Sequence, residues 1–353
     1  MNYMATLYHS FYEFHHRHIK LSTLPQITTI EVTNACNLAC PMCSRDAIIR
    51  QRGLGFMKFA DFKAVVDKYH MQMFHVRLFL HGESTLHPNL PEMVAYLNDY
   101  RGKNVRSIGL TTNGVLVSAD YFRRLVDAGL DNIEFSFEGI DKQTYESIRV
   151  GANFEQVKYH IRDACAINTE RGIDVGINII DMKQTHDRLP EFVSEWSKVE
   201  GLSRIDFGTL HDWNETLNVD RFGGSSFSTE YAPRIVSVCP APWFTALIHW
   251  NLTVVPCCRW LSKPFGNILE QDLAEIWNCI EMVELRKTML KGRQHHSYCR
   301  TCAYNPFTKG SPYLVKPSKF YPFTLSFLKS IFTYRKVTNK TYRPSRSGVE
   351  TVD

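Results

Sequence analysis

Hydrophobic and polar positions follow two alternating periods between residue 27 and about residue 210. Short β-branched or aromatic runs predict strands, and the stretches between them repeat apolar residues every three or four positions, which predicts helices. Ser118 and Asn153 each stand just before such a stretch and are residue types that cap helix N-termini. The expected strands cover 27–33, 75–80, 105–110, 132–137, 173–180 and 203–209, and the expected helices cover 59–70, 89–101, 118–128, 153–170 and 186–199.

Repeated strand–helix units predict an α/β fold with a parallel sheet and crossover helices. Six units are too few to close an eight-stranded barrel, so we expect a partial (β/α)6 TIM-like barrel over residues 27–210, open on one side. Residues 1–26 are aromatic and rich in histidine, and we expect a helical extension that lies on the body.

The composition changes after the barrel. Residues 211–238 contain Gly-Gly-Ser-Ser and a proline, which is typical of a linker. Residues 239–305 are rich in cysteine and predict a small α+β domain, with a hairpin around Asn251 and a helix from about 270 to 290. Residues 306–353 combine five prolines with a surplus of lysine and arginine, which predicts a basic tail.

The overall composition is that of a soluble globular protein, with 44% apolar and 22% charged residues among 353. The chain has neither an apolar run long enough to span a membrane nor a secretory signal, so we expect it in the cytoplasm. The tail carries a net charge of +7 and the rest of the chain −2. Because the rest of the chain is nearly neutral, we do not expect a nucleic-acid partner. A membrane surface would suit the tail, but a solvated tail is the favoured interpretation.

Ten cysteines are many for a cytosolic chain, where clustered thiols bind metals or do redox work. Cys36, Cys40 and Cys43 form C-x3-C-x2-C directly after the first expected strand, where parallel α/β folds carry their chemistry. Three thiolates can hold a [4Fe–4S] cluster and leave one iron open, whereas structural zinc takes four ligands. The spacing favours iron–sulfur over zinc, for which His75 or His81 would be the fourth ligand.

The segment CNLACPMC after a first strand resembles the signature of radical S-adenosylmethionine (SAM) enzymes. The resemblance implies that the open iron chelates the amino and carboxylate groups of SAM. One electron then cleaves SAM to methionine and a 5′-deoxyadenosyl radical, which takes a hydrogen atom from an unactivated C–H bond. An electron donor such as flavodoxin or ferredoxin is implied as a partner.

Four later segments resemble SAM-binding turns of the same family, in the same order along the chain. LHGES at 80–84 and TTNG at 111–114 resemble the turns after strands two and three. SFEG at 136–139 resembles the end of strand four, with Glu138 where the family often has aspartate, and YESIRVG at 145–151 follows it. The SAM contacts that the resemblance implies are Gly82, Glu83, Asn113, Ser136 and Arg149.

A second group of cysteines lies in the C-terminal domain. A C-x2-C pair with two distant cysteines is a four-ligand set for zinc or an iron–sulfur cluster, and spacing does not choose between them. The stretch resembles the SPASM/twitch extension of radical SAM enzymes, which implies one closed auxiliary [4Fe–4S] cluster with a role in electron transfer. The implied ligands are Cys239, Cys257, Cys299 and Cys302.

Cys258 stands beside the expected ligand Cys257 and has three interpretations. It is a small buried hydrophobic residue, which is the usual role of a free cysteine. Alternatively it exchanges with Cys257 as a ligand, or it gives a hydrogen atom to the substrate as in radical epimerases. The first interpretation is favoured.

Relatives with one auxiliary cluster include enzymes that oxidise alcohols to ketones on sugars and aminocyclitols, and this reaction suits the predicted sites. Only 35 residues precede Cys36, which leaves no room for the leader-binding module of many peptide-modifying relatives, so a sugar or cyclitol substrate is favoured. His211 and Asp212, just past the sixth strand, are candidates for the base. The alternatives are an epimerase, a peptide-modifying enzyme and a zinc-stabilised binding module.

Overall fold

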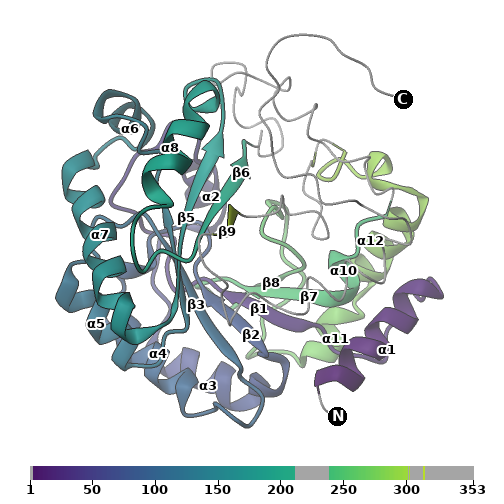
Figure 1. Cartoon of the computed structure of the whole chain (residues 1–353). Helices are drawn as coiled ribbons and strands as arrows, with labels where there is room; N and C mark the ends of the chain where they lie inside the picture. The colour runs from purple at the N-terminus through teal and green to yellow at the C-terminus, as the bar shows by residue number, and fades with distance from the viewer. Residues whose placement is uncertain (1–2, 211–237, 301, 303–312, 315–353) are drawn as a thin grey trace, which may run out of the picture.

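A single sheet of nine strands organises the computed structural model, which describes residues 3–210, 238–300, 302 and 313–314 (Figure 1). The sheet order is β8-β7-β1-β2-β3-β4-β5-β6-β9, and β1 to β6 are parallel neighbours. The strands are β1 Gln26–Ile30, β2 His75–Leu78, β3 Ser107–Thr112, β4 Asn132–Ser136, β5 Asp174–Asp181, β6 Arg204–Thr209, β7 Thr245–Ile248, β8 Val254–Val255 and β9 Tyr313–Leu314.

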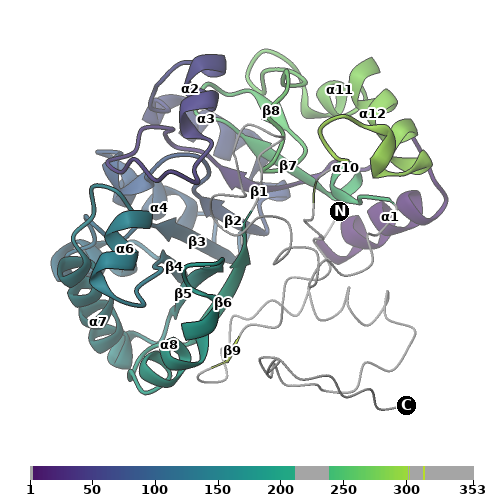
Figure 2. The same cartoon turned by 90° about the horizontal axis from the view of Figure 1, so that it is seen from above.

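Helices cover the outer face of β1 to β6, and the sheet curls without closing (Figure 2). This arrangement confirms the predicted α/β partial barrel. The α-helices between β1 and β6 are α2 Arg45–Arg52, α3 Phe59–Tyr69, α4 Leu90–Asn98, α5 Ala119–Asp127, α6 Lys142–Ile148, α7 Phe154–Arg171 and α8 Leu189–Trp196. In the described part of the chain, 3-10 turns lie at His70–Gln72, Ser84–Leu86, His186–Arg188 and Arg293–His295.

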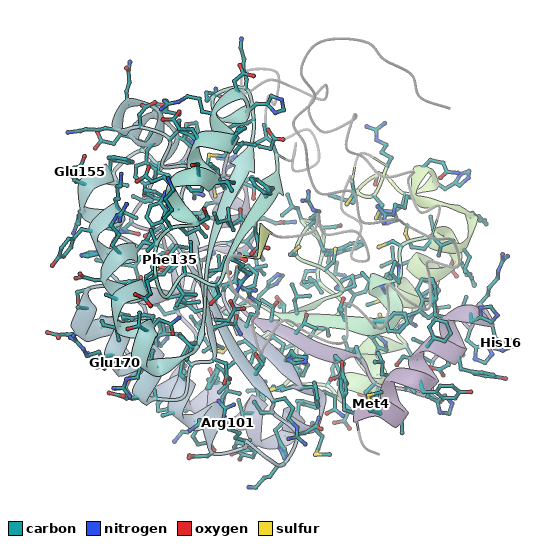
Figure 3. All side chains as sticks on the ribbon, in the orientation of Figure 1. Met4, His16, Arg101, Phe135, Glu155 and Glu170 are labelled. Carbon is teal, nitrogen blue, oxygen red and sulfur yellow. The ribbon has the colours of Figure 1, made fainter. Side chains whose placement is uncertain are left out.

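The period-two pattern of the strands separates an apolar outer face from a polar inner one. Ile133 and Phe135 are fully buried under the helices, whereas Glu134 points to the other face of β4. Figure 3 shows the same contrast, with Phe135 in the core and Glu155 and Glu170 projecting from the outer surface of α7. The inner face of this barrel is therefore polar.

Arg204 is the centre of a buried ion-pair network on that inner face. Its guanidinium contacts Asp174, Asp206 (2.7 Å) and Glu134 (3.4 Å). Burial opposes the charge of Arg204, but the three carboxylates raise its pKa above the ordinary value. Arg77 from β2 lies 3.7 Å from Glu134, so the network reaches across the barrel interior.

Both predicted helix caps are confirmed. The side chain of Ser118 accepts a hydrogen bond from the backbone N–H of Tyr121, and that of Asn153 accepts one from Gln156. The other end of α7 is closed by Gly172, whose φ of +71° is the left-handed conformation that favours glycine.

The expected hairpin around Asn251 is confirmed as β7 and β8, but it is not separate from the barrel sheet. Strand β7 pairs in parallel with β1, and β8 pairs with β7 in antiparallel fashion. At the opposite edge, Tyr313–Leu314 within the predicted tail pair with β6. The rest of the tail and nearly all of the predicted linker lie outside the described residues.

The predicted helix from about 270 to 290 is two helices, α11 Leu273–Trp277 and α12 Ile280–Lys291. Asn278 lies at the break, and its side chain binds the N-terminal segment. Its Oδ1 accepts from the backbone N–H of Leu21 at 2.8 Å, and its Nδ2 donates to the Leu21 carbonyl at 2.9 Å.

The N-terminal helix, α1 Tyr3–His15, packs beside α10 Ala241–Phe244 in the C-terminal part of the chain (Figure 1). The indole N–H of Trp243 donates to the carbonyl of His18 at 2.7 Å. No helix within the described part of the chain is long and apolar enough to span a membrane.

Arg286 on α12 joins these segments, because its guanidinium donates to the carbonyls of Pro242, Ile19 and Trp277 at 2.7–2.9 Å. We expect Arg286→Met to lower the free energy of unfolding by about 3 kcal/mol, since buried carbonyls lose charged donors. Urea unfolding monitored by circular dichroism measures this. Lys287→Met is the matched control at the exposed neighbouring position and should change the value by under about 0.5 kcal/mol; equal losses in both variants would contradict the assigned role.

Candidate active site

The loop between β1 and α2 carries Cys36, Cys40 and Cys43 at the carboxyl edge of the parallel strands. The backbone N–H of Cys43 donates to the Cys40 carbonyl at 3.0 Å, which turns this loop. Burial raises the pKa of Cys36 to about 11, and the nearby Glu83, Cys40 and Cys43 contribute to the rise. The three thiols therefore lie close enough to interact electrostatically.

Gly82 lies directly against the start of this loop. A Cβ atom at Gly82 would stand 2.5 Å from the carbonyl oxygen of Thr33 and 2.6 Å from that of Ala35, so only glycine fits. The next residue, Glu83, donates its backbone N–H to the Ala35 carbonyl at 2.7 Å. The turn after β2 thus positions the segment that leads into Cys36.

The carboxylate of Glu83 is buried and fully engaged by the protein. It accepts from the hydroxyls of Thr85 (2.6 Å) and Thr112 (2.8 Å) and from the backbone N–H of Asn113 (2.6 Å). Burial raises the pKa of Glu83, and these hydrogen bonds oppose the rise. The side chain therefore joins the turn after β2 to the end of β3.

Asn113 faces the cysteine loop from the end of β3. Its Nδ2 donates to Asn37 Oδ1 at 2.8 Å and lies 3.9 Å from Cys36 Sγ. Ser136 ends β4 and is half-buried, and its hydroxyl makes no hydrogen bond within the described residues. Ser136 is thus the one predicted SAM contact that the structure does not connect to the loop.

Arg149 and Glu138 form a buried bidentate ion pair, with N–O distances of 2.6 and 2.9 Å. The third nitrogen of Arg149, Nη1, lies 3.9 Å from Cys40 Sγ. Burial opposes the charge on Arg149, but Glu138 and Cys40 raise its pKa. Glu138 thus has a specific partner, and a positive charge is directed at the sulfur loop.

The second cysteine set gathers on the C-terminal part of the chain. Burial raises the pKa of Cys239, of Cys257 and of Cys299, the last to about 12, and the neighbouring thiols of the set contribute. Cys302 is among these neighbours. The C-x2-C pair and the two distant cysteines therefore lie close enough to interact electrostatically.

Arg293 is a cation at this second set that sequence reasoning missed. It is buried, its Nη1 donates to the carbonyl of Cys302 at 3.0 Å, and its charge lowers the pKa of Cys239 and Cys299 against the effect of burial. The only sequence signal was an arginine six residues before Cys299.

The sulfur atoms within each cysteine set are spread more widely than the ligands of one zinc ion. Within the described residues, neither cysteine set brings three sulfurs within 4.8 Å of one another. Tetrahedral zinc with Zn–S bonds of about 2.3 Å requires sulfurs about 3.8 Å apart. As described, neither set therefore has three sulfurs at the spacing of a bound zinc ion.

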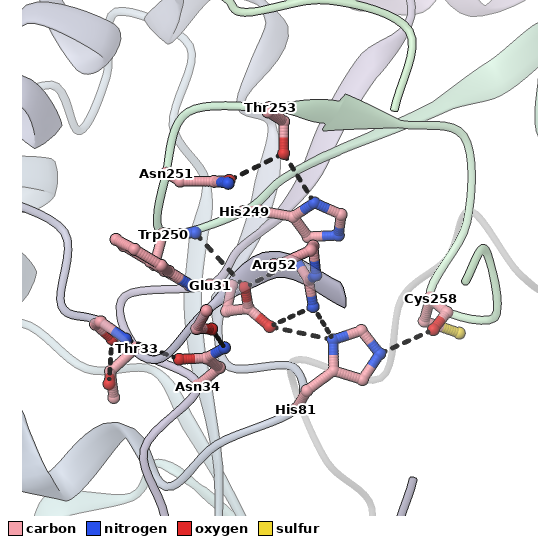
Figure 4. Close-up of polar contacts among 12 residues, drawn as sticks. Glu31, Thr33, Asn34, Arg52, His81, His249, Trp250, Asn251, Thr253 and Cys258 are labelled. Carbon is pink, nitrogen blue, oxygen red and sulfur yellow. Dashed lines mark hydrogen bonds and ion pairs between the residues drawn. The ribbon is translucent and has the colours of Figure 1, made fainter. Parts of the chain in front are cut away.

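A buried polar network joins the end of β1 and the turn after β2 to the segments around Trp250 and Cys258 (Figure 4). Glu31, directly after β1, contacts Arg52 (3.1 Å) and His81 (2.9 Å), and it accepts from the backbone N–H of Trp250 (3.3 Å). Burial alone would raise the pKa of Glu31, but His81, His249 and Arg52 hold it at about 2. His81 was predicted to be a structural residue beside the turn after β2 rather than a zinc ligand, but no motif predicted the network.

The two predicted base candidates, His211 and Asp212, lie outside the described residues. A different pair, His186 and Asp181, is described at the carboxyl end of β5, where Nδ1 and Oδ1 are 2.8 Å apart. Cys258 is half-buried beside Cys257, and its carbonyl oxygen lies 3.2 Å from His81 Nε2.

Family comparisons agree with this geometry. Residues 30–195 match the radical SAM superfamily, and residues 239–303 match SPASM, an iron–sulfur cluster-binding domain. The chain therefore carries a radical SAM region over residues 30–195 and a C-terminal SPASM region over residues 239–303. These two regions imply three kinds of cofactor: SAM, a SAM-binding [4Fe–4S] cluster and auxiliary iron–sulfur clusters. The predicted cofactor classes are thereby confirmed.

Individual relatives place the chain within a broad group. A probable GTP 3′,8-cyclase of Methanococcus maripaludis is 31% identical over 183 residues, which are 50% of this chain and 56% of that protein. The match thus spans about half the length of this curated relative. Among solved structures, Streptococcus suis SuiB bound to precursor peptide SuiA has a TM-score of 0.61 at 14% identity, covering 84% of this chain and 75% of SuiB. BtrN in complex with AdoMet and 2-DOIA has a TM-score of 0.52 at 17% identity, covering 84% and 99%.

Iron retention should depend on pH. Because the pKa of Cys36 is about 11 and that of Cys299 about 12, both thiols are protonated at neutral pH and must lose their protons to bind iron. Retention against a chelator should therefore weaken as the pH falls from about 8.5 to about 6.5, by up to about tenfold per pH unit for each released proton. Anaerobic chelator competition measures this; stronger retention at the lower pH would contradict it.

Breaking the Arg149 pair should destabilise the fold. We expect Glu138→Gln to lower the free energy of unfolding by about 3 kcal/mol, because Arg149 keeps its buried charge without a carboxylate. Glu155→Gln, an exposed position on α7, is the control and should have little effect. Urea titration of the apoprotein tests both variants, and an unchanged midpoint in Glu138→Gln would disprove this account.

Proposed function

We propose that the chain is a radical SAM oxidoreductase that dehydrogenates an alcohol of a polar small molecule, a sugar or cyclitol, with the auxiliary cluster as electron acceptor. One observation carries the proposal: β7 of the SPASM part pairs with β1, the strand that leads into the SAM-cluster loop. The segment that leads into Cys36 and the hairpin that leads into Cys257 therefore belong to one sheet. Such adjacency suits transfer of an electron from a substrate between them.

The roles of the cysteines follow from the two sets. In this proposal Cys36, Cys40 and Cys43 hold the SAM-binding cluster, which with SAM supplies the 5′-deoxyadenosyl radical that abstracts hydrogen. Gly82, Glu83, Asn113, Ser136 and Arg149 orient SAM. The auxiliary cluster is held by Cys239, Cys257, Cys299 and Cys302.

The polar barrel interior supports a polar substrate. Arg77, Thr111 and Glu134 lie on the inner face of neighbouring strands, and Arg77 donates to the Thr111 hydroxyl at 2.6 Å. Hydroxyl-rich molecules can replace their hydrogen bonds to water by hydrogen bonds to such side chains.

We retain His211 and Asp212 as proposed bases. The proposed setting is the cytoplasm, with flavodoxin or ferredoxin as reductant.

An epimerase is the second candidate, because Cys258 is a further thiol at the junction of the two parts. Its thiolate would raise the pKa of both Cys239 and Cys257, so the Cys258 sulfur lies beside the auxiliary set. In an epimerase, the Cys258 thiol would have to give its hydrogen atom to the substrate from this position beside the auxiliary set.

A substrate screen tests the main proposal. Anaerobically reconstituted protein should contain about eight irons per chain and form 5′-deoxyadenosine on reduction with SAM. With the right cyclitol or sugar, mass spectrometry should find a product lighter by two hydrogens, in proportion to deoxyadenosine. A product of unchanged mass with inverted configuration would replace dehydrogenation by epimerisation, and a modified peptide would replace both.

Cys258→Ala separates the two candidates. A dehydrogenase should keep ketone formation within about threefold of the wild type, since a neutral small residue replaces a neutral small residue. An epimerase should still form deoxyadenosine but lose the inverted product. Cys279→Ala, at the start of α12, is the matched control and should behave as wild type; chromatography of products and deoxyadenosine from the same reactions decides.

A further inference from the structure

His81 contacts both halves of the molecule with its two ring nitrogens. Nδ1 lies 2.9 Å from Glu31 Oε1 on the barrel side, and Nε2 lies 3.2 Å from the carbonyl oxygen of Cys258 on the SPASM side (Figure 4). The side chain is 3% exposed, so water does not compete for these contacts. The contact joins two segments that are far apart in the chain, because His81 and Cys258 are separated by 177 positions.

The chemistry of the partners fixes one proton. A backbone carbonyl only accepts, so Nε2 carries a hydrogen and donates it to Cys258. At Nδ1 the partners differ, because the Glu31 carboxylate only accepts and Arg52, 3.0 Å away, only donates. The Nε2 contact is therefore present in either protonation state of Nδ1.

The place of His81 in the chain gives this contact a consequence. His81 immediately precedes Gly82, whose backbone lies against the loop to Cys36, and its other partner follows Cys257 directly. We propose that His81 is a positioning residue that ties the SAM-binding turn to the ligand segment of the auxiliary cluster through the Cys258 carbonyl. This inference rests on the proposed function for the assignment of Cys257 as a ligand.

A metal ion at this cluster is the competing interpretation, since ligand atoms of Glu31, His81 and His249 lie within 4.8 Å of one another. Arg52 argues against it. The guanidinium already pairs with Glu31 at 3.1 Å and lies 3.0 Å from His81 Nδ1, so a cation would meet a fixed positive charge. Glu31 thus already has arginine as its cationic partner.

Two isosteric variants separate the contacts of His81. The amide nitrogen of glutamine overlays Nε2 of histidine, and that of asparagine overlays Nδ1. His81→Gln keeps the donor to Cys258, whereas His81→Asn keeps a donor to Glu31 alone. Both are made in the full-length chain carrying Cys36→Ala, Cys40→Ala and Cys43→Ala, so that iron reports only the auxiliary cluster.

The first measurement is the rate of iron release to a chelator under anaerobic conditions, together with the electron paramagnetic resonance spectrum of the reduced cluster. We expect His81→Asn to release iron about tenfold faster with an altered spectrum, and His81→Gln to stay within about threefold of the parent. The second measurement needs no cluster: in the apoprotein, amide hydrogen exchange at 256–260 should rise in His81→Asn and much less in His81→Gln.

His87 provides the matched control, because it is another buried histidine of the same turn and its Nε2 bonds the Met57 carbonyl within the barrel. His87→Asn should leave iron release and exchange at 256–260 unchanged. Equal behaviour of His81→Asn and His81→Gln, or the same effect in His87→Asn, would overturn the inference while leaving the proposed function intact. Failure of the 239–302 segment to bind any iron would overturn both.

Discussion

The contact between Gly82 and the segment before Cys36 is the constraint on which the rest of the site depends. The backbone of this glycine lies so close to the carbonyls of Thr33 and Ala35 that no side chain can be added. The turn after β2 thereby fixes the position of the cysteine loop that follows β1. Glu83 extends the constraint to β3, because its carboxylate accepts from Thr112 and Asn113. Three loops that are far apart in sequence become one rigid edge.

That edge is continuous with the SPASM part because β7 extends the barrel sheet at β1. Sheet pairing brings the ends of β1 and β7 together, and the buried carboxylate of Glu31 then bonds across this junction to the backbone of Trp250. Such a carboxylate is stable only with partners on every side, which Arg52 and His81 provide. The polar network therefore requires both parts in their observed arrangement.

Local signals in the sequence predicted what is local in the structure. The strands, most of the helices, the caps at Ser118 and Asn153 and the cysteine sets all arise from period, residue type or short spacing. The pairing of β7 with β1 and the break at Asn278 were missed, because each depends on a partner more than two hundred residues away. Periodicity carries no information about such partners.

The same limit explains which site residues were found. Glu83 and Asn113 stand in turns directly after strands, so a short motif identified them, and their positions beside the loop agree with it. Arg293 and the role of Glu138 depend on tertiary contacts and have no motif.

Two buried arginines, Arg149 and Arg293, bear on the same electrostatic problem. Burying a thiolate costs free energy, and a fixed guanidinium nearby offsets that cost without the reorganisation that water would need. Arg149 meets the first set at Cys40, and Arg293 meets the second at Cys302. The molecule thus places a buried arginine beside each set of cysteines, so that a positive charge lies near the thiols of both.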